Sequence, residues 1–311
     1  MSGAAATVLS ARPHQGFVET PFVRDLASRA IAYLSAGFPV HFRGPSGSGK
    51  STLAMHVAHR LGRPVMLICG DDEFGTSSLV GGESGYRRRR VIDNYVHSVL
   101  KTEEDFTQRW VDNRLTIAVR EGLTLIYDEF TRSRPEANNV LLSVLEEKLL
   151  VLPTSRNGSS YIPVHPGFAA IFTSNPEDYA GVHKTQDALR DRMVTMDVDY
   201  FDRETEIAIT QARANIDVQD AERVVSIVRR FRETGEPEFV PTVRSCIMIG
   251  KVLALRGIPA DGRDPVFVQT CIDVLCSQSN RAGTGGRKVD KRRTVLLDLI
   301  NRMCGSQSET A

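Results

Sequence analysis

The fold that this sequence predicts is decided by the stretch Gly44–Ser51, which reads GPSGSGKS. A short apolar run at Val40–Phe42 precedes it, and residues 53–61 behind it carry apolar side chains at helical spacing. The order is therefore a buried strand, a glycine-rich turn and an amphipathic helix. In such a unit the backbone N–H groups of the turn and the N-terminus of the helix bind phosphate groups. The stretch therefore predicts an α/β fold with a phosphate-binding site.

The residue types of this turn suit a polyphosphate and its metal ion. Glycines at three positions allow backbone angles that turn successive N–H groups inward. Lys50 supplies a positive charge for the β- and γ-phosphates, and the Ser51 hydroxyl is placed to bind Mg²⁺. The predicted nucleotide-binding residues of the turn are Gly44, Pro45, Ser46, Gly47, Ser48, Gly49, Lys50, Ser51 and Thr52.

Further strand-like segments follow along the chain. Apolar runs at Val65–Cys69, Leu123–Tyr127 and Phe168–Ser174 alternate with helical patterns up to about residue 200, and only helix signals come after it. Strands that alternate with helices predict a parallel sheet. The predicted fold class is α/β, with a doubly wound parallel sheet followed by a smaller all-helical domain.

Two adjacent acidic residues, Asp128 and Glu129, follow the apolar run Leu123–Tyr127. Two carboxylates at the end of a buried strand are costly unless a cation lies beside them. We predict that Asp128 binds Mg²⁺, and that Glu129 accepts a proton from the water that attacks the γ-phosphate. The alternative is a pair that only serves the N-terminus of a helix. The chain lacks the guanine-reading Asn-Lys-x-Asp motif, so we predict ATP rather than GTP.

Asn175 follows the next apolar strand. In open parallel sheets, ligands bind beyond the carboxyl ends of the strands, and Gly44, Asp128 and Asn175 each follow such an end. We therefore predict that Asn175 orients the attacking water or contacts the γ-phosphate. The alternative is an Asn-Pro pair that only opens a turn.

This order of motifs resembles that of the AAA+ P-loop ATPases, more narrowly of their MoxR branch, and within it of the gas vesicle protein N family. The resemblance covers most of residues 40–195. It is carried by the long segments Gly70–Gly81, Ser84–Glu104, Trp110–Thr116, Tyr127–Glu147 and Phe172–Met193. The first forty residues and the region after about residue 200 match more loosely.

The resemblance implies roles for further residues. Asn175 stands at the sensor 1 position of the family, and Arg192 stands where the family has an arginine finger that reaches into the site of a neighbouring subunit. Arg190 lies two residues away and is the other candidate for the finger, of which we favour Arg192. Arg244 stands where the sensor 2 residue begins a helix of the lid.

The resemblance also implies an assembly and a function. A finger that acts on a neighbour requires a ring, so a homo-hexamer that forms with ATP is implied. The implied activity is Mg-ATP hydrolysis for chaperone-like remodelling that assists gas vesicle assembly and growth in the cytoplasm, with vesicle shell or accessory proteins as partners. Two alternatives are a MoxR-type activase of a metalloenzyme and a nucleotide-switched minor structural or binding component of the vesicle.

The composition agrees with a folded enzyme. The chain has 311 residues, 41% of them hydrophobic and 25% charged, which suits two domains. The formal net charge of +1 predicts no strongly charged partner such as nucleic acid. No apolar run is long enough to span a membrane, and the chain does not begin like a secretory signal. The five cysteines lack a Cys-x-x-Cys pair, which argues against zinc and disulfides.

We predict four parts of the chain: an N-terminal extension at residues 1–16, the α/β domain at 17–200, a helical lid at 201–280 and a basic tail at 281–311. The tail carries seven basic and three acidic residues, and we expect a solvated amphipathic helix there. The α/β domain contains an insert at about residues 84–104 with four consecutive arginines, Arg87–Arg90. We prefer partner contact in the ring as their role, and the alternative is an exposed hairpin arm with solvated charges.

A further helix is predicted behind Pro135. Leu141, Leu145 and Leu149 recur at a spacing of four behind Pro135, so we expect them on one buried helix face, with Glu146 and its neighbour solvated.

Overall fold

A computed structural model describes residues 8–9, 16–92, 102–156, 159–176, 187–236, 240–276 and 285–304 of the chain. It divides into two compact units, which we describe separately. The α/β unit comprises residues 1–12, 31–43 and 57–196, and the helical unit comprises residues 13–30, 44–56 and 197–311. The helices α1 (Pro21–Ser35) and α2 (Lys50–Arg60) have residues in both units. The domain bounds of the sequence analysis stay a prediction.

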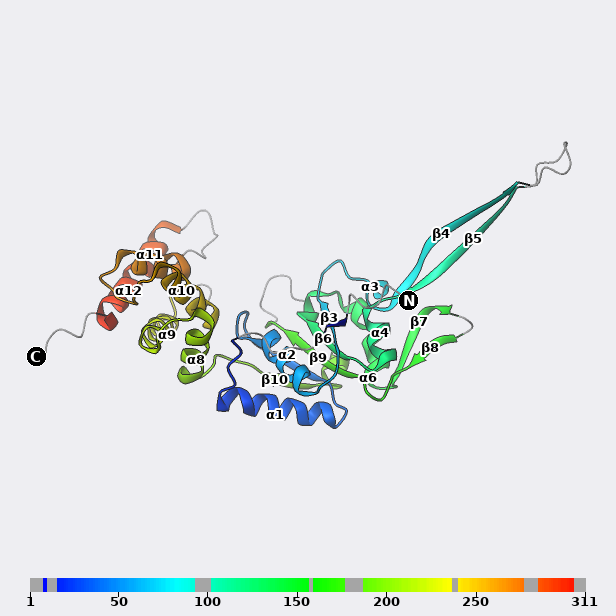
Figure 1. Cartoon of the computed structure of the whole chain (residues 1–311), viewed down its shortest axis with the longest axis horizontal. Coiled ribbons are helices and arrows are strands. Elements are labelled where there is room, and N and C mark those ends of the chain that lie inside the picture. The colour runs from blue at the N-terminus through cyan, green and yellow to red at the C-terminus, as the bar shows by residue number, and fades with distance from the viewer. Residues whose placement is uncertain are drawn as a thin grey trace, which may run out of the picture. The chain divides into compact units, whose positions relative to one another are not determined.

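The α/β unit is built on one six-stranded sheet (Figure 1). Its strand order is β1 (Val8–Leu9), β3 (Val65–Cys69), β6 (Thr124–Asp128), β9 (Ala169–Ser174), β2 (Val40–Arg43) and β10 (Val194–Asp197). The pairs β3–β6, β6–β9 and β9–β2 are parallel, whereas the short β1 is antiparallel to β3. The predicted α/β fold with a parallel sheet is therefore confirmed.

Short helices lie along the chain between these strands. They are α3 (Thr76–Val80), α4 (Arg114–Glu121), the 3₁₀ turn η1 (Phe130–Arg132), α5 (Pro135–Asn138), α6 (Val140–Leu145) and α7 (Asp187–Arg190). Leu115 of α4, Leu141 of α6 and Phe172 of β9 are at most 1% exposed and belong to one hydrophobic cluster. Every residue of β9 is buried, as expected for an inner strand of a parallel sheet that is covered on both faces.

Two antiparallel hairpins extend this unit. The strands β4 (Gly81–Ile92) and β5 (Thr102–Asp112) pair so that Arg87 stands opposite Thr107 and Arg90 stands opposite Glu104. The stretch Arg87–Arg90 therefore lies in a hairpin, which was one of the two interpretations of this insert, and its role stays a prediction. The second hairpin joins β7 (Leu149–Arg156) to β8 (Ser159–Pro163).

The prediction that Leu149 continues the buried helix face is wrong. Helix α6 ends at Leu145, and Leu149 is the first residue of β7. Between them, Lys148 takes a left-handed conformation with φ +56°, and its ammonium donates to the Leu145 carbonyl at 2.8 Å. The lysine thus caps the last turn of the helix and redirects the chain into the hairpin, which the apolar spacing alone does not reveal.

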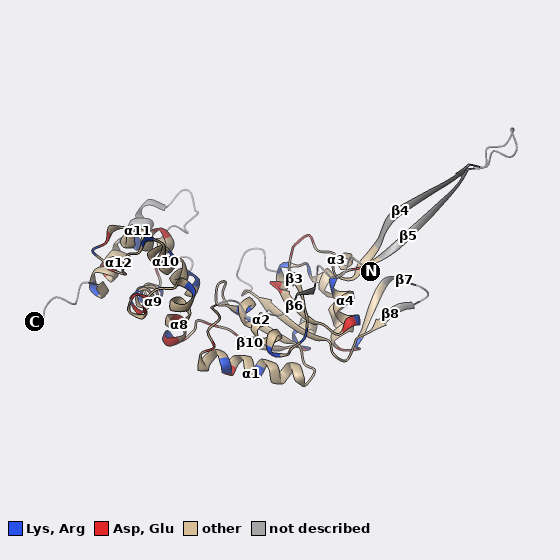
Figure 2. Cartoon of the chain, in the orientation of Figure 1, with Lys and Arg blue, Asp and Glu red and all other residues tan. Residues whose placement is uncertain are grey.

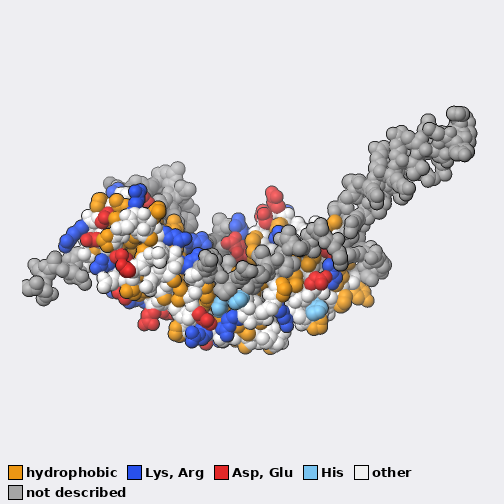
Figure 3. Space-filling model, viewed as in Figure 1, with side chains coloured by type: hydrophobic (Ala, Val, Ile, Leu, Met, Phe, Trp, Pro, Cys, Tyr) orange, Lys and Arg blue, Asp and Glu red, His pale blue; other side chains and the backbone are white. Residues whose placement is uncertain are grey.

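The helical unit has five helices among the residues that the structure describes after residue 200. They are α8 (Arg203–Ala214), α9 (Val218–Glu233), α10 (Val243–Arg256), α11 (Pro265–Cys276) and α12 (Gly285–Cys304). Asp202 caps α8 by accepting from the Thr205 N–H at 2.8 Å, and Asn215 ends it in the left-handed conformation. On the face that Figure 3 shows, acidic and basic side chains of this unit are interspersed.

The expectation of a solvated helix in the basic tail is wrong. In α12 the side chains of Leu296 and Ile300 are fully buried in the same cluster as Phe231 of α9 and Phe267 of α11. Their spacing of four residues places them on one face, and burial of that face outweighs the basic charge around it. None of the described helices, α12 included, has the length and the apolar character that crossing a membrane requires.

Truncation of this buried face tests its contribution to the fold. We expect Ile300→Ala to lower the free energy of unfolding by about 2–5 kcal/mol, because it leaves a cavity in a closed core. Asn301→Ala, at an exposed position of the same helix, is the matched control and should change it by less than about 0.5 kcal/mol. Urea unfolding followed by circular dichroism measures both, and equal midpoints for the two variants would mean that α12 is not part of the core.

Candidate functional site

The glycine-rich turn follows β2 directly and ends where α2 begins at Lys50. Gly47 and Gly49 have φ values of +83° and +87°, which L side chains rarely adopt. Lys50 is buried, and its ammonium donates to the carbonyl oxygens of Gly44 at 2.9 Å and Pro45 at 2.7 Å. The turn therefore holds the lysine ammonium at the loop, where the sequence predicts that phosphate groups bind.

The same glycines allow other segments of the helical unit, to which the loop belongs, to come close to it. A Cβ on Gly47 would lie 2.5 Å from Thr242 Oγ1, and one on Gly49 would lie 3.3 Å from the Phe201 ring. The sequence suggested that Gly44 is needed for its backbone angles, but the structure shows that it is needed for space. Its backbone is not left-handed, but a Cβ there would lie 2.1 Å from the Val198 carbonyl oxygen.

A cavity of about 290 Å³ lies beside this loop within the helical unit. Most of its walls are apolar, and the few polar residues include Thr52 and Arg244 of the predicted site. A small apolar cavity with a few polar groups suits the planar ring of a nucleotide base. Its lining residues are Gly16, Phe17, Val18, Val23, Gly47, Gly49, Thr52, Leu53, Phe201, Ile209, Arg213, Val243, Arg244 and Ile247.

The acidic pair lies at the carboxyl end of β6 in the α/β unit. Asp128 is the last residue of β6, and Asn175 directly follows β9, its parallel neighbour. Parallel strands end at the same edge of a sheet, so both residues lie at the edge where β2 ends at Arg43. The phosphate loop begins at the next residue of the chain, Gly44.

Glu129 has a strained backbone. Its φ and ψ are +51° and +41°, in the left-handed region that non-glycine residues seldom occupy. Gly70 makes room for this turn, because a Cβ on Gly70 would lie 2.0 Å from the Glu129 carbonyl oxygen. The Glu129 carboxylate accepts from Arg132 at 2.9 Å. This ion pair is exposed, so it contributes little stability and is easily opened.

Thr173 joins the two acidic residues, and sequence reasoning missed it. Its hydroxyl donates to the Asp128 carboxylate and accepts from the Glu129 N–H at 2.9 Å. One buried side chain of β9 thus orients the carboxylate and holds the strained turn. The only sequence signal was its place two residues before Asn175, and a threonine in a buried strand is too common to be distinctive.

Replacement of Thr173 tests this bridge. Thr173→Val keeps the shape but removes both hydrogen bonds, so we expect the Mg²⁺ concentration for half-maximal ATP hydrolysis to rise about tenfold. Thr124→Val is the control, because the hydroxyl of this buried β6 residue has no hydrogen-bond partner among the described residues. Magnesium titrations of ATPase activity measure both variants, and identical titrations would show that the bridge does not orient Asp128.

A buried tyrosine fixes the turn that follows the acidic pair. The hydroxyl of Tyr127 donates to Ser133 Oγ at 2.7 Å, and Ser133 Oγ also accepts from the Asp71 N–H at 3.1 Å. Burial raises the pKa of Tyr127 to about 12, although the bond to Ser133 opposes the shift, so the phenol stays a donor. Figure 2 shows in red the acidic loop between β3 and α3 to which Asp71 belongs.

Arg192 has a partner in its own unit. Its Nε donates to Glu146 Oε2 at 2.7 Å, a second guanidinium nitrogen contacts the same oxygen, and another donates to the Ala188 carbonyl. Glu146 is exposed, as expected, and it pairs with this arginine as well. Arg190, the other candidate finger, is the last residue of α7 and is partly buried. These contacts do not distinguish the two arginines as fingers.

The cysteines offer no metal site in the described part of the chain. Burial raises the pKa of the Cys246 and Cys271 thiols, and burial together with the Asp128 carboxylate raises that of Cys69. Thiols that stay protonated are poor metal ligands. Among the described residues no three His, Cys, Asp or Glu side chains are grouped to bind an ion. The predicted ligands Ser51 and Asp128 are oxygen donors. They suit Mg²⁺, which takes its remaining ligands from phosphates and water.

Comparison with known proteins agrees with this geometry. Residues 39–193 match the AAA domain family of the dynein-related subfamily. The solved structure of NtrX from Brucella abortus in complex with ADP superposes with a TM-score of 0.52 at 16% identity, over 93% of this chain and 64% of that one. At this identity the likeness concerns the fold alone. The sequence motifs, the fold and the domain match together define an ATPase of the AAA class.

Relatives with higher sequence identity define the family within this class. Gas vesicle ATPase GvpN of Ancylobacter aquaticus is 52% identical over 303 residues, which are 96% of this chain and 84% of that protein. The GvpN of Haloferax mediterranei is 46% identical over 266 residues, 85% of this chain and 75% of that one. Protein NorQ of Paracoccus denitrificans is 29% identical over 69% of this chain and 72% of its own. The chain belongs to the gas vesicle ATPase GvpN family.

Proposed function

We propose that this protein hydrolyses Mg-ATP and uses the energy to remodel proteins during gas vesicle assembly and growth. The observation that carries the proposal is the phosphate loop that borders an apolar cavity. There, Gly47 and Gly49 take left-handed backbone angles that turn the loop, and Lys50 is held at the loop. The acidic pair at the carboxyl edge of the sheet supplies the groups that hydrolysis needs in addition.

In this proposal each predicted residue has one task. The backbone of Gly44–Ser51 and the Lys50 ammonium bind the phosphates, and the cavity binds the base beside Arg244. Ser51 and Asp128 hold Mg²⁺, which neutralises charge on the phosphate oxygens when it is bound.

The remaining residues act on the attacking water and on the phosphoryl group. Glu129 accepts the proton of the water, which Asn175 orients. Arg192 reaches the site of a neighbouring copy and stabilises the charge on the transferred phosphoryl group, which requires a ring, as in a homo-hexamer that forms with ATP.

The biological role is proposed from the relatives. Proteins named gas vesicle ATPase are 45–52% identical to this chain, whereas NorQ is 29% identical. This difference favours a vesicle function over activation of a metalloenzyme. Shell or accessory proteins of the vesicle are the proposed partners, and the cytoplasm is the proposed location. A role as a nucleotide-switched vesicle component without catalytic turnover is the second candidate, because the name of a relative does not specify how ATP is used.

An experiment in cells that make gas vesicles distinguishes these two candidate functions. The chromosomal copy is replaced by the Glu129→Gln variant, which should bind ATP but not hydrolyse it, and vesicles are scored by electron microscopy and flotation. The motor function predicts cells without full-width, buoyant vesicles. Normal vesicles in these cells would contradict it and leave a switched component as the function.

A further inference from the structure

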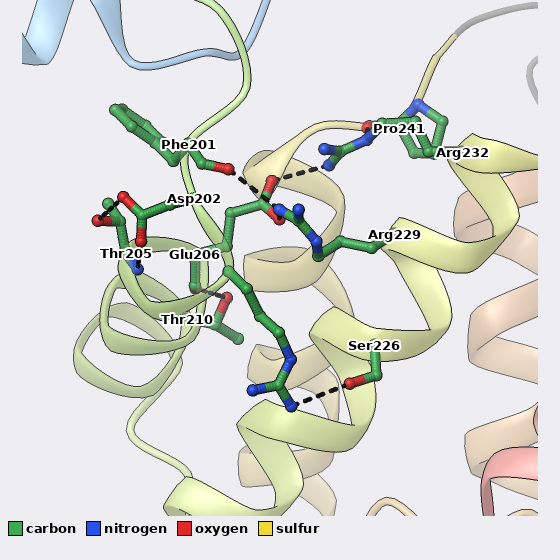
Figure 4. A network of polar contacts seen from close by, with 10 residues as sticks. Phe201, Asp202, Thr205, Glu206, Thr210, Ser226, Arg229, Arg232 and Pro241 are labelled. Carbon is green, nitrogen blue, oxygen red and sulfur yellow. Dashed lines mark hydrogen bonds and ion pairs between the residues drawn. The ribbon is translucent and has the colours of Figure 1, made fainter. Parts of the chain in front are cut away.

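A buried carboxylate, that of Glu206, joins two helices of the helical unit. The Glu206 side chain is 1% exposed, and its two oxygens accept from Arg229 at 2.9 Å and from Arg232 at 2.8 Å (Figure 4). Glu206 belongs to α8, and both arginines belong to α9, one turn apart. The Arg232 guanidinium also lies over the Tyr200 ring, 4.2 Å from its centroid. The charges of this network are thus paired, and Arg232 is held on two sides.

The guanidinium groups of the same two arginines also bind the backbone of two loops. Arg229 donates to the Phe201 carbonyl oxygen at 3.0 Å, in the segment that leads into α8. Arg232 donates through Nε to the Pro241 carbonyl oxygen at 2.8 Å, in the segment that leads into α10. Glu206 therefore connects both loops through one arginine each.

Both of these loops touch the phosphate loop. The Phe201 ring limits the space at Gly49, and Thr242, the residue after Pro241, limits the space at Gly47. Phe201 and Arg244 also line the cavity beside the loop. The two walls of this cavity are therefore tied to one carboxylate.

Stability alone does not account for such a network. A buried ion pair seldom stabilises a fold more than apolar side chains of the same size, because both charges lose their water. Arg229 and Arg232 are instead directed at two backbone carbonyls, and planar guanidinium groups fix both distance and angle at such acceptors. The arrangement therefore suits a role in geometry.

We propose that Glu206, Arg229 and Arg232 are positioning residues of the nucleotide site, which set the spacing of Phe201 and Arg244 from the phosphate loop. The proposal rests on the proposed function, since the ligand of the cavity is taken to be ATP or ADP. The three residues do not touch the nucleotide, and they act through the two loops that do.

Arg232→Lys is the test variant. Lysine keeps the charge beside Glu206, but its single ammonium cannot reproduce the fork that binds Glu206 and the Pro241 carbonyl together. We expect the Kd for a fluorescent ADP analogue to rise about tenfold, as for a small misplacement of binding groups. Arg230→Lys is the matched control, because Arg230 is exposed on the same helix and pairs with the exposed Glu233 at 3.2 Å. It should leave the Kd unchanged.

Two further measurements separate positioning from stability. The melting temperature without nucleotide should stay close to that of the wild type, and Arg232→Lys should weaken binding much less in a chain that already carries Arg244→Ala, because both act on the same wall. If Arg232→Lys does not fold, Glu206→Gln is measured by the same criteria. A wild-type Kd in the folded variant overturns this inference. Failure of the wild type itself to bind the analogue overturns the proposed function instead.

Discussion

Replacing Glu129 by Gln is expected to stop ATP turnover while ATP still binds. The amide keeps the size of the side chain and can still accept from Arg132, so the strained turn and its contacts stay intact. It cannot take a proton from the attacking water, and loss of a general base lowers kcat by about 10²–10⁴-fold. The phosphate loop, with Lys50, is unaffected, so the Kd for ATP should change by less than about twofold.

Phosphate release and equilibrium binding of ATP measure the two halves of this prediction. Glu147→Gln is the control, because Glu147 is an exposed acid after α6 with no role in the proposed site. It should leave both quantities unchanged. Turnover by the Glu129→Gln variant within a few fold of the wild type would show that another group accepts the proton.

Replacing Arg192 by Ala is expected to lower turnover in the assembled protein about 10³-fold with little effect on ATP affinity. An arginine that neutralises charge on the transferred phosphoryl group contributes mainly in the transition state, and such fingers contribute at least this factor. In the structure Arg192 is bound to Glu146, whose side chain is 58% exposed. This contact must open for the guanidinium to reach a neighbour, so Glu146→Gln should preserve turnover.

A mixture of two inactive variants tests whether the finger acts on a neighbour. Glu129→Gln lacks the base but keeps the finger, and Arg192→Ala keeps the base but lacks the finger. In a mixed ring the first variant supplies its arginine to the site of the second, so activity should return on mixing. Arg190→Ala in place of Arg192→Ala decides between the two arginines. Light scattering that reports a monomer both with and without ATP, or a mixture that stays inactive, would contradict a finger in trans.

Local spacing was enough to place the glycine-rich turn after β2 and the acidic pair at the end of β6. Each is a short motif at the end of a buried apolar strand, and the carboxyl ends of parallel strands meet at one edge of a sheet, so Asp128 and Asn175 could be placed together in advance. The strain at Glu129 was not visible, because no local pattern marks a left-handed acidic residue.

The cavity and its support could not be predicted, because they join distant parts of the chain. Phe17 and Ile209 line the same cavity but lie almost 200 residues apart, and neither belongs to a motif. Glu206 resembles any acidic residue in the first turn of a helix until α9 is packed against it. In α12 the spacing of Leu296 and Ile300 was visible, but the basic charges around them favoured solvent in the sequence.

The proposed function requires that the phosphate loop and the acidic pair hold one and the same Mg-ATP. It is tested most directly by titrating ATP, with and without Mg²⁺, into the Glu129→Gln chain, in which no hydrolysis disturbs the equilibrium. Mg²⁺ should raise the affinity for ATP, and the additional change Asp128→Asn should remove that increase while metal-free binding stays the same. An increase with Mg²⁺ that survives Asp128→Asn would contradict a shared site.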